Sequence, residues 1–237
     1  TSGATHNKCV APYCARYHTE RFPLERYMHI DLHTHTAIGS DCSEIQPTAM
    51  VTAAIEAGLD AICITDHVFH GLTLRHDPHR VFAGFRATHQ AAAASGVLVL
   101  PGIEFSFNEG DFLVFGLDET VLPELGESYS LQTCLALAHR ENGVVVQAHP
   151  FRYGGQPTRL VDAIETLNGG NSDEHNRLAA VWSQANGMVA LAGSDAHEAW
   201  QVGRCYTVFD GPCASVTDLC QAIRQRRVRR LVHRHRQ

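Results

Sequence analysis

The segment HIDLHTHTAIGSD, residues 29–41, decides how this 237-residue chain is interpreted. Its first half has the pattern of a β-strand, and His33 and His35 stand at the end of that strand with Thr34 between them. Because side chains of a strand alternate between its two faces, both imidazoles can face one side and hold one cation together. A lone His-x-His pair is weak evidence, since a single histidine is more often a hydrogen-bonded core residue. Further potential ligands elsewhere in the chain are therefore needed to support a metal site at His33 and His35.

Short apolar runs alternate with helix-like runs along the remaining sequence. Strands are expected at residues 28–33, 61–66, 97–104, 112–116, 144–149, 161–168, 188–194 and 205–210. Helices are expected at residues 47–57, 78–95, 131–142, 173–186 and 217–229. Repeated strand–helix units predict an α/β domain with a mostly parallel sheet, open or closed into a barrel. We take residues 28–237 as that single domain and residues 1–27 as an N-terminal extension.

Residues able to bind a cation stand at the carboxyl ends of these predicted strands. They are His33, His35, His67, Glu104, His149, Asp195 and His197, with Asp41 in the loop after the first strand. In parallel α/β folds the carboxyl ends of the strands meet at one edge, where active sites form. Imidazoles together with carboxylates are the ligands that borderline divalent cations require. The sequence therefore predicts a metal centre at that edge, in which Glu104 has two oxygens that can bridge neighbouring ions.

In their order along the chain these motifs resemble those of the PHP (polymerase and histidinol phosphatase) domain family. DLHTHT followed by SD, ITDH, GIE, AHP and GSDAH are similar to its successive motifs, from about residue 28 to residue 210. The resemblance implies a distorted seven-stranded β/α barrel and a metal-dependent phosphoesterase with two or three ions of Zn, Mn or Fe. It assigns His33, His35, Glu104 and Asp195 to one ion, Asp41, His67 and His197 to another, and Glu104 with His149 to a further ion.

The sequence departs from the family pattern after the strand that follows Glu104, where the fullest pattern has an additional histidine. The corresponding segment, DFLVFGLDET at residues 111–120, contains none. Asp118 is the nearest residue able to replace it as a ligand, and the alternative is a surface carboxylate in a turn. A centre with two ions and a centre with three ions are both compatible with this sequence.

Glu104, Asp195 and Arg152 are the expected catalytic residues. Arg152 follows the AHP motif by two residues, so its guanidinium is a candidate for binding a substrate phosphate, the alternative being a surface ion pair. Asn168 stands at the same edge, either as a contact to substrate or ligand or as a turn residue. The expected reaction is hydrolysis of a phosphate ester by a metal-bound hydroxide.

Two substrate classes and one non-enzymatic function fit this pattern. The first expected substrate is a nucleotide, or an oligonucleotide phosphodiester or phosphate end. The second is a small phosphomonoester, as in a histidinol-phosphatase-like enzyme. The rival of a different class is a non-catalytic PHP domain whose metals serve stability or partner binding.

Composition excludes other classes of protein. The formal net charge of −6 and the 44% hydrophobic content indicate an ordinary globular protein and not a basic nucleic-acid coat. No apolar run approaches the roughly 18–20 residues that span a bilayer. Residues 1–10 lack the apolar stretch of a secretory leader, so we expect a cytoplasmic protein without membrane contact. The oligomeric state stays open.

Two segments carry weaker signals. Seven arginines lie within residues 224–236, and they suit either the solvated face of a last helix with a frayed end or a contact to phosphate groups. In the N-terminal extension, the two histidines and two cysteines His6, Cys9, Cys14 and His18 could hold a structural zinc ion. The alternative is a strap with free thiols.

Overall fold

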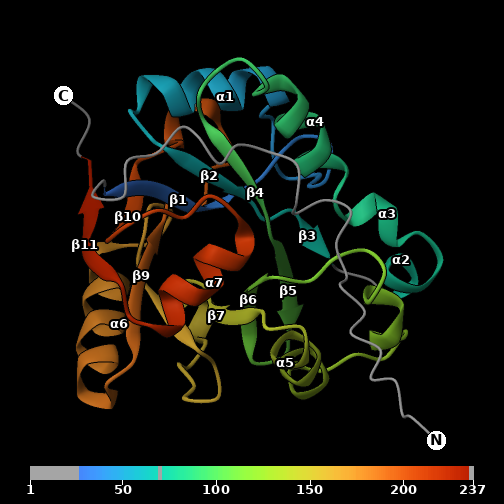
Figure 1. The fold of residues 1–237 in the computed structure, drawn as a ribbon. Coiled ribbons are helices and arrows are strands. Elements are labelled where there is room, and N and C mark those ends of the chain that lie inside the picture. The colour runs from blue at the N-terminus through green and yellow to red at the C-terminus, as the bar shows by residue number, and fades with distance from the viewer. Residues whose placement is uncertain (1–26, 69–70, 235–237) are drawn as a thin grey trace, which may run out of the picture.

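The computed structural model describes residues 27–68 and 71–234, so His6, Cys9, Cys14 and His18 lie outside the described residues. Two mixed sheets form the framework, with strand orders β11-β10-β1-β2-β4 and β3-β5-β6-β7-β8-β9 (Figure 1). The strands are β1 (Met28–Thr34), β2 (Ala61–Ile64), β3 (His67–Val68), β4 (Leu98–Pro101), β5 (Ile103–Phe107), β6 (Gly110–Phe115), β7 (Val144–Gln147), β8 (Ala163–Asn168), β9 (Val189–Gly193), β10 (Cys205–Phe209) and β11 (Val228–His233).

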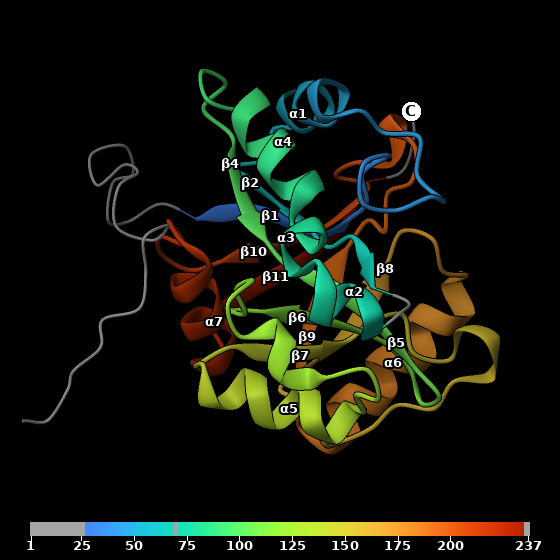
Figure 2. The same cartoon turned by 90° about the vertical axis from the view of Figure 1, so that its right-hand side faces the viewer.

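Helices cover the outside of these sheets. They are α1 (Pro47–Glu56), α2 (Gly71–His76), α3 (Pro78–Val81), α4 (Ala83–Ala91), α5 (Leu131–Arg140), α6 (Asp173–Asn186) and α7 (Val216–Arg224). Ser130 and Ser172 accept backbone hydrogen bonds as N-caps of α5 and α6, and Gly187 ends α6 with a left-handed φ of 62°. Figure 2 shows α1 and α4 side by side over β2 and β4. In the described residues, none of the helices is both long and apolar enough to cross a membrane.

The two sheets meet at two places and together form a distorted barrel. Gly102 alone separates β4 from β5, although these strands belong to different sheets. A Cβ atom on Gly102 would lie 2.8 Å from side-chain atoms of both Phe115 and Thr65, so the crossing point requires glycine. Elsewhere an isolated parallel bridge joins Thr34, at the end of β1, to Ala196, just after β9. The fold is therefore α/β and barrel-like, as the sequence predicts, but the strands form two ladders.

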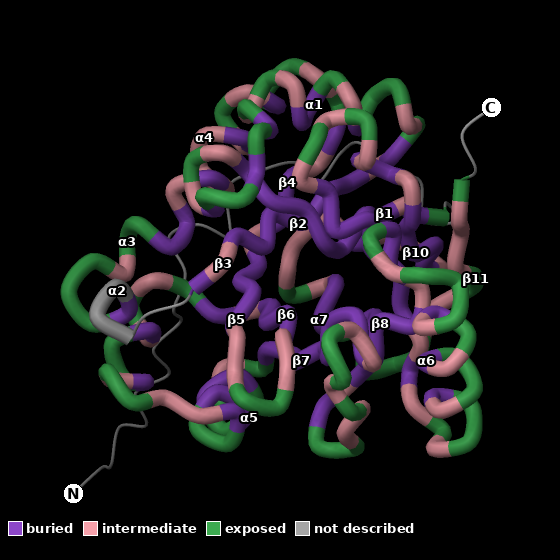
Figure 3. The backbone as a smooth tube through the Cα atoms, turned by 180° about the vertical axis from the view of Figure 1, so that it is seen from behind, coloured by how far each residue is buried: buried purple, intermediate pink, exposed green. Residues whose placement is uncertain are grey.

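The interior of the barrel is an apolar cluster that α7 closes from one end. Met28 and Ile30 of β1 and Phe115 of β6 pack there against Leu219 and Ile223 of α7. Figure 3 shows the strands buried at the centre and exposed residues on the surrounding helices. The apolar closure at this end leaves the polar side chains of the barrel to gather at the other end.

Strand direction determines which residues reach that polar end. Strands β1, β2 and β4 are parallel to one another, and so are β7, β8 and β9. Strand β6 is antiparallel to both of its neighbours, β5 and β7. Parallel strands present their carboxyl ends to a common edge, whereas β6 presents its beginning to that edge.

Several element boundaries differ from the sequence prediction. The expected strand 97–104 is divided into β4 and β5, and the expected helix 78–95 is divided into α3 and α4. The expected last helix 217–229 ends at Arg224, and the frayed end is wrong because Val228–His233 pairs antiparallel with β10. The apolar residues at the end of the chain complete a sheet there, which a helical pattern of arginines does not reveal.

Candidate metal centre

Glu104, at the polar end of β5, is fully buried and contacts four imidazoles through its two carboxylate oxygens. Its Oε2 lies 3.2 Å from Nε2 of His33, 3.2 Å from Nε2 of His35 and 3.1 Å from Nδ1 of His67. Its Oε1 lies 3.2 Å from Nε2 of His149. Burial alone would raise the pKa of Glu104, but the adjacent histidines hold that pKa well below its usual range. Glu104 is therefore an ionised bridge between four histidines from three segments of the chain.

Strand β1 delivers His33 and His35 to the same side, as the sequence predicts. The pairing of β1 with β2 shifts register near the end of β1. Leu32 still packs in the interior apolar cluster, and the next residue, His33, already reaches the metal centre. An irregularity of this kind changes the face of the sheet toward which the following side chains point. Thr34 turns away and donates from Oγ1 to the carbonyl oxygen of Cys63 at 2.8 Å.

Asp195 follows β9 and contacts the same two histidines. Its Oδ1 lies 3.4 Å from Nε2 of His33 and 3.3 Å from Nε2 of His35. The residue has a φ of 55°, in the left-handed region that non-glycine residues rarely adopt. Its backbone N–H donates to the carbonyl oxygen of His33 at 2.8 Å, which fixes this conformation. Burial would raise the pKa of the Asp195 carboxyl, but His33 and His35 hold it well below its usual range.

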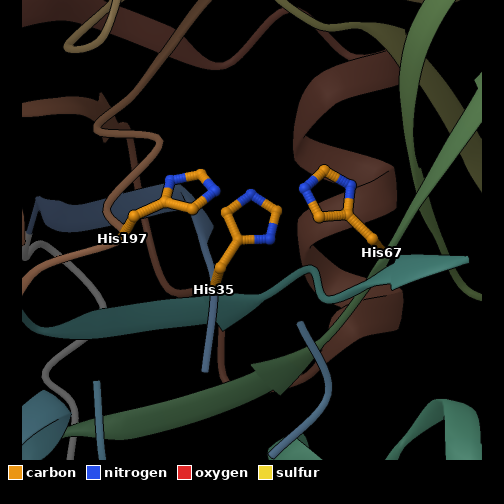
Figure 4. Close-up of side chains that lie close together, drawn as sticks. All are labelled: His35, His67 and His197. Carbon is orange, nitrogen blue, oxygen red and sulfur yellow. The ribbon is translucent and has the colours of Figure 1, made fainter. Parts of the chain in front are cut away.

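Three overlapping groups of potential ligand atoms result, in each of which the atoms lie within 4.8 Å of one another. The groups are His33 with His35 and Asp195, His33 with Glu104 and His149, and His35 with His67 and His197. Figure 4 shows the last group, in which the ring of His35 lies between the other two rings. The ring centroid of His35 is 4.4 Å from those of both His67 and His197. Seven of the eight predicted metal ligands therefore converge.

The histidines at the open side of the centre are poised to stay neutral. Burial lowers the pKa of His67 to about 4, and the neighbouring His35 and His33 add to the shift. Burial also lowers the pKa of His197, whose Nδ1 lies 2.9 Å from the backbone oxygen of Asp195. A Nδ1–H that donates to this oxygen leaves Nε2 of His197 as a lone-pair donor. Neutral imidazole nitrogens are the form that binds a cation.

The side chains at the centre fit a divalent cation. Nε2 of His35 is buried and makes no hydrogen bond within the described part of the chain, although oxygens of Glu104 and Asp195 lie 3.2 and 3.3 Å away. A buried polar atom without a hydrogen bond is costly. Nitrogen and carboxylate oxygen atoms directed at a common point are the donor set of Zn²⁺, Mn²⁺ and Fe²⁺.

Glu165 of β8 supports His33 from behind, although none of the sequence motifs includes it. Its Oε1 lies 3.1 Å from Nδ1 of His33, and its Oε2 accepts hydrogen bonds from the backbone N–H of His149 at 2.9 Å and from Nδ2 of Asn168 at 2.8 Å. A carboxylate on Nδ1 fixes the tautomer in which Nε2 faces the metal centre. The available signal was a charged residue inside the buried apolar strand Ala163–Asn168.

Asp66 holds the loop after β1, in which the predicted metal ligand Asp41 lies. Buried Asp66 accepts hydrogen bonds from the backbone N–H of Thr36 at 2.7 Å, from Oγ1 of Thr36 at 2.8 Å and from Oγ of Ser40 at 2.9 Å. Burial raises the pKa of Asp66, and these hydrogen bonds offset part of the increase. Asp41 is exposed and belongs to none of the three groups of the described residues, so its role as a ligand stays a prediction.

The structure contradicts Asp118 as the replacement for the missing histidine. Asp118 is exposed, and its Oδ1 accepts a hydrogen bond from the backbone N–H of Thr120 at 2.8 Å in a turn. Because β6 runs antiparallel to β5, Asp118 lies beyond the end of β6 that points away from the metal centre. Asp111, near the start of β6, lies at the correct edge, with Oδ2 3.9 Å from Nε2 of His149.

Arg152 reaches the centre, but its guanidinium is occupied by protein groups. Nη1 donates to Oδ2 of Asp195 at 2.7 Å, Nη2 to Oδ1 of Asn168 at 2.7 Å and Nε to Oδ1 of Asn171 at 2.9 Å. A Cβ atom on Gly170 would lie 2.9 Å from Nη2, so glycine leaves room for this clamp. In this arrangement Arg152 orients Asp195, and a direct contact with a substrate phosphate stays a prediction.

Comparison with known proteins places the chain among similar sequences and folds. Residues 173–228 match the family model described as PHP-associated. A stretch of 109 residues, 39% of this chain, is 32% identical to the DNA polymerase III PolC-type of Oceanobacillus iheyensis and spans 7% of that protein. A two-domain protein from Bacteroides vulgatus, containing a predicted PHP-like metal-dependent phosphoesterase, has a TM-score of 0.67 and 19% identity over 86% of this chain and 64% of its own.

A lesion-specific endonuclease from Pyrococcus furiosus has the same fold, with a TM-score of 0.56 and 16% identity. The alignment covers 84% of this chain and 56% of the endonuclease. The chain thus spans a small part of the polymerase and less than two thirds of either solved structure. The two solved structures show the fold of the chain, and the two sequence matches each cover less than half of it.

Proposed function

We propose that the chain is a metal-dependent phosphoesterase of the PHP type that works at the centre around Glu104, and its similarity to the PHP-associated family model and to PHP-like folds supports this. The observation that carries the proposal is the contact of one buried, ionised carboxylate with four imidazoles. A purely structural polar network would satisfy its buried nitrogens with hydrogen bonds, whereas Nε2 of His35 faces two carboxylate oxygens at 3.2 and 3.3 Å without the geometry of a hydrogen bond. An arrangement of this kind is typical of a metal site and serves no apparent need of the core.

The three groups of ligand atoms suggest where the ions would be held. His33, His35 and Asp195 would hold one ion, and His35 with His67 and His197 a second, with Glu104 bridging. Glu104 with His33 and His149 would hold a further ion. Divalent ions at such positions lower the pKa of water and neutralise the charge of phosphate oxygens. Zn, Mn and Fe all suit these donors.

The remaining side chains would orient this centre. Arg152 would fix the rotamer of Asp195, and Glu165 would fix the tautomer of His33. Asn168 connects the two, because it accepts from Arg152 through Oδ1 and donates to Glu165 through Nδ2. Preorganised groups of this kind are what catalysis requires, since they need not rearrange during the reaction.

Two substrate classes remain to be compared. A nucleotide, or an oligonucleotide phosphodiester or phosphate end, is supported by the similarity to a DNA polymerase and by the fold shared with an endonuclease. A small phosphomonoester is supported by a cavity of about 300 Å³ beside His149, which is small for a nucleic-acid strand. The non-enzymatic alternative is a PHP domain whose metals serve stability or partner binding.

A hydrolysis assay separates these alternatives. We expect bis-p-nitrophenyl phosphate, p-nitrophenyl phosphate or both to be hydrolysed when Mn²⁺ is added, and not after chelation. Asp195→Ala should abolish the activity, whereas the exposed control Asp173→Ala on α6 should retain it. Absence of turnover with any ester at full metal loading would refute the enzyme and favour the non-catalytic alternative.

A further inference from the structure

A cavity of about 300 Å³ opens beside the metal centre, and two turns and His149 line it. One wall is the turn that connects β5 to β6 and carries Glu109. The other wall is the turn after β7, residues 150–155. His149 and Asp111 line the end of the cavity that adjoins the metal centre. A phosphate ester bound at the centre would therefore extend its alcohol part into this space.

Two aromatic residues, Phe107 at the end of β5 and Tyr153 in the turn after β7, line the cavity. Phe107 belongs to the first wall and is fixed by ring contacts to Phe112 and Tyr129, with centroid distances of 5.6 and 5.5 Å. Tyr153 belongs to the second wall and is 96% exposed, with a φ of 52°. A left-handed backbone is costly for a bulky residue, and burial of the tyrosine ring does not compensate for it here. The exposed ring of Tyr153 suits contact with another flat ring.

The lining of the cavity has two carboxylates, Glu109 and Asp111, and one guanidinium, Arg152. Glu109 forms no ion pair among the described residues, and the basic group paired with Asp111 is His149, at 3.9 Å. Arg152 lines the cavity as well, but its charge is matched by Asp195 and its donors are already occupied. A second phosphate group on the substrate would therefore meet carboxylates in this cavity and no free guanidinium.

We propose that this cavity binds the leaving group of the ester and selects a flat ring with a positive charge over one with a negative charge. In this arrangement Phe107 and Tyr153 contact the ring, and Glu109 and Asp111 face its charge. The inference rests on the proposed phosphoesterase function and adds the class of leaving group. It favours small aryl-like esters over a nucleic-acid strand, because each further phosphate of a strand would be repelled by the lining.

Three matched esters test the proposal with the full-length, Mn²⁺-loaded protein. They are 4-(aminomethyl)phenyl phosphate, 4-(hydroxymethyl)phenyl phosphate and 4-(carboxymethyl)phenyl phosphate, whose charges differ while a methylene group keeps the phenol leaving groups similar. We expect kcat/KM, from release of inorganic phosphate, to be at least about tenfold higher for the cationic than for the anionic ester. The preference should arise mainly in KM and shrink as salt concentration rises.

Two variants assign the preference to the cavity. Glu109→Gln should reduce the cationic-to-anionic ratio several-fold, whereas Glu56→Gln, an exposed carboxylate at the end of α1, should keep the ratio. Tyr153→Ala should raise KM for all three aryl esters. Equal kcat/KM for the three esters, or an unchanged ratio in Glu109→Gln, would overturn the proposal while leaving the phosphoesterase function intact.

Binding of the product alcohols keeps the two claims separate. 4-Hydroxybenzylamine and 4-hydroxyphenylacetate can be titrated by NMR whether or not any ester is hydrolysed. We expect the amine to bind more tightly, with the difference reduced in Glu109→Gln. Failure of all three esters to react, with this binding preference present, would refute the proposed function and retain the cavity. Equal binding of both alcohols would refute the cavity proposal.

Discussion

Arg152 donates a 2.7 Å hydrogen bond from Nη1 to Oδ2 of Asp195, and the other oxygen of the same carboxylate faces His33 and His35. The guanidinium thus holds a carboxylate whose backbone has a positive φ. Asn168 and Asn171 occupy the remaining guanidinium nitrogens and hold Arg152 in turn. A residue expected from the sequence to bind substrate is therefore built into the support of the metal centre.

Replacing Arg152 should weaken metal binding as well as activity. Loss of a residue that orients a metal ligand typically costs about 10–100-fold in affinity. We expect this loss for Arg152→Gln, and a smaller loss for Arg152→Lys, which keeps the charge but cannot satisfy three acceptors. Chelator competition measures the affinity. Arg159→Gln, an exposed arginine close by in the chain, is the control, and unchanged metal affinity in Arg152→Gln would contradict the positioning role.

Glu165→Gln should weaken the same centre by a different route. The glutamine keeps the size of the side chain, but it removes the charge that fixes the Nδ1–H tautomer of His33. We expect metal affinity to fall about 10–100-fold. Titration with Mn²⁺ and a competing chelator measures the loss, with the exposed Glu174→Gln on α6 as the control. An equal affinity in Glu165→Gln and wild type would show that His33 is oriented without this contact.

The metal-free protein should lose stability between pH 6.5 and 9 because of His35. Burial would lower the pKa of His35, but Asp195 and Glu104 outweigh it and raise the pKa to about 9. A pKa that is higher in the folded state contributes stability below about pH 6.5, and the contribution disappears as pH rises through 9. The shift corresponds to at most about 3 kcal/mol.

Urea unfolding of metal-free protein at pH 6 and pH 9.5 measures this change in free energy. His67, whose pKa is lowered to about 4, costs stability only as pH falls below about 6.5, so it does not enter this window. The His35→Gln variant should show a smaller fall in stability. Saturating Mn²⁺ should also reduce the fall, because a cation displaces the proton. A free energy of unfolding that rises from pH 6.5 to 9 would contradict the prediction.

Asp111 and Asp118 form a matched pair for counting ions. We expect Asp111→Asn to weaken the most weakly held ion several-fold, because its Oδ2 lies 3.9 Å from Nε2 of His149, and Asp118→Asn to have no effect. Elemental analysis after dialysis gives the metal-to-protein ratio. A lower ratio in Asp118→Asn, or equal ratios in wild type and Asp111→Asn, would contradict the assignment.

The positions of the candidate ligands were predictable from the sequence, whereas their support was not. His33 and His35 follow from strand periodicity, and Glu104, His149 and Asp195 follow from the rule that active sites lie at the carboxyl ends of parallel strands. That rule is local to each strand and needs no knowledge of its neighbours. It gave seven of the side chains that the structure brings together.

The predictions that were wrong or missing depend on contacts between segments far apart in the sequence. Asp118 was expected as the nearest possible ligand after that strand, but the antiparallel pairing of β6 with β5 and β7 turns the end of β6 away from the centre. Glu165 was missed because its partner, His33, lies 132 residues away in the sequence. The division of one predicted strand at Gly102 depends on the space left by Phe115 and Thr65. None of these contacts leaves a periodic pattern.

The connection between β5 and β6 consists of Asn108 and Glu109 alone. Residues added at such an exposed hairpin tip lie outside the ladder that ends at Phe107 and Gly110, and each doubling of loop length costs only about 0.6 kcal/mol. The rim of the centre can therefore change by insertion while Glu104 stays in place. Insertions at this tip would change which molecules reach the centre without moving the residues that form it.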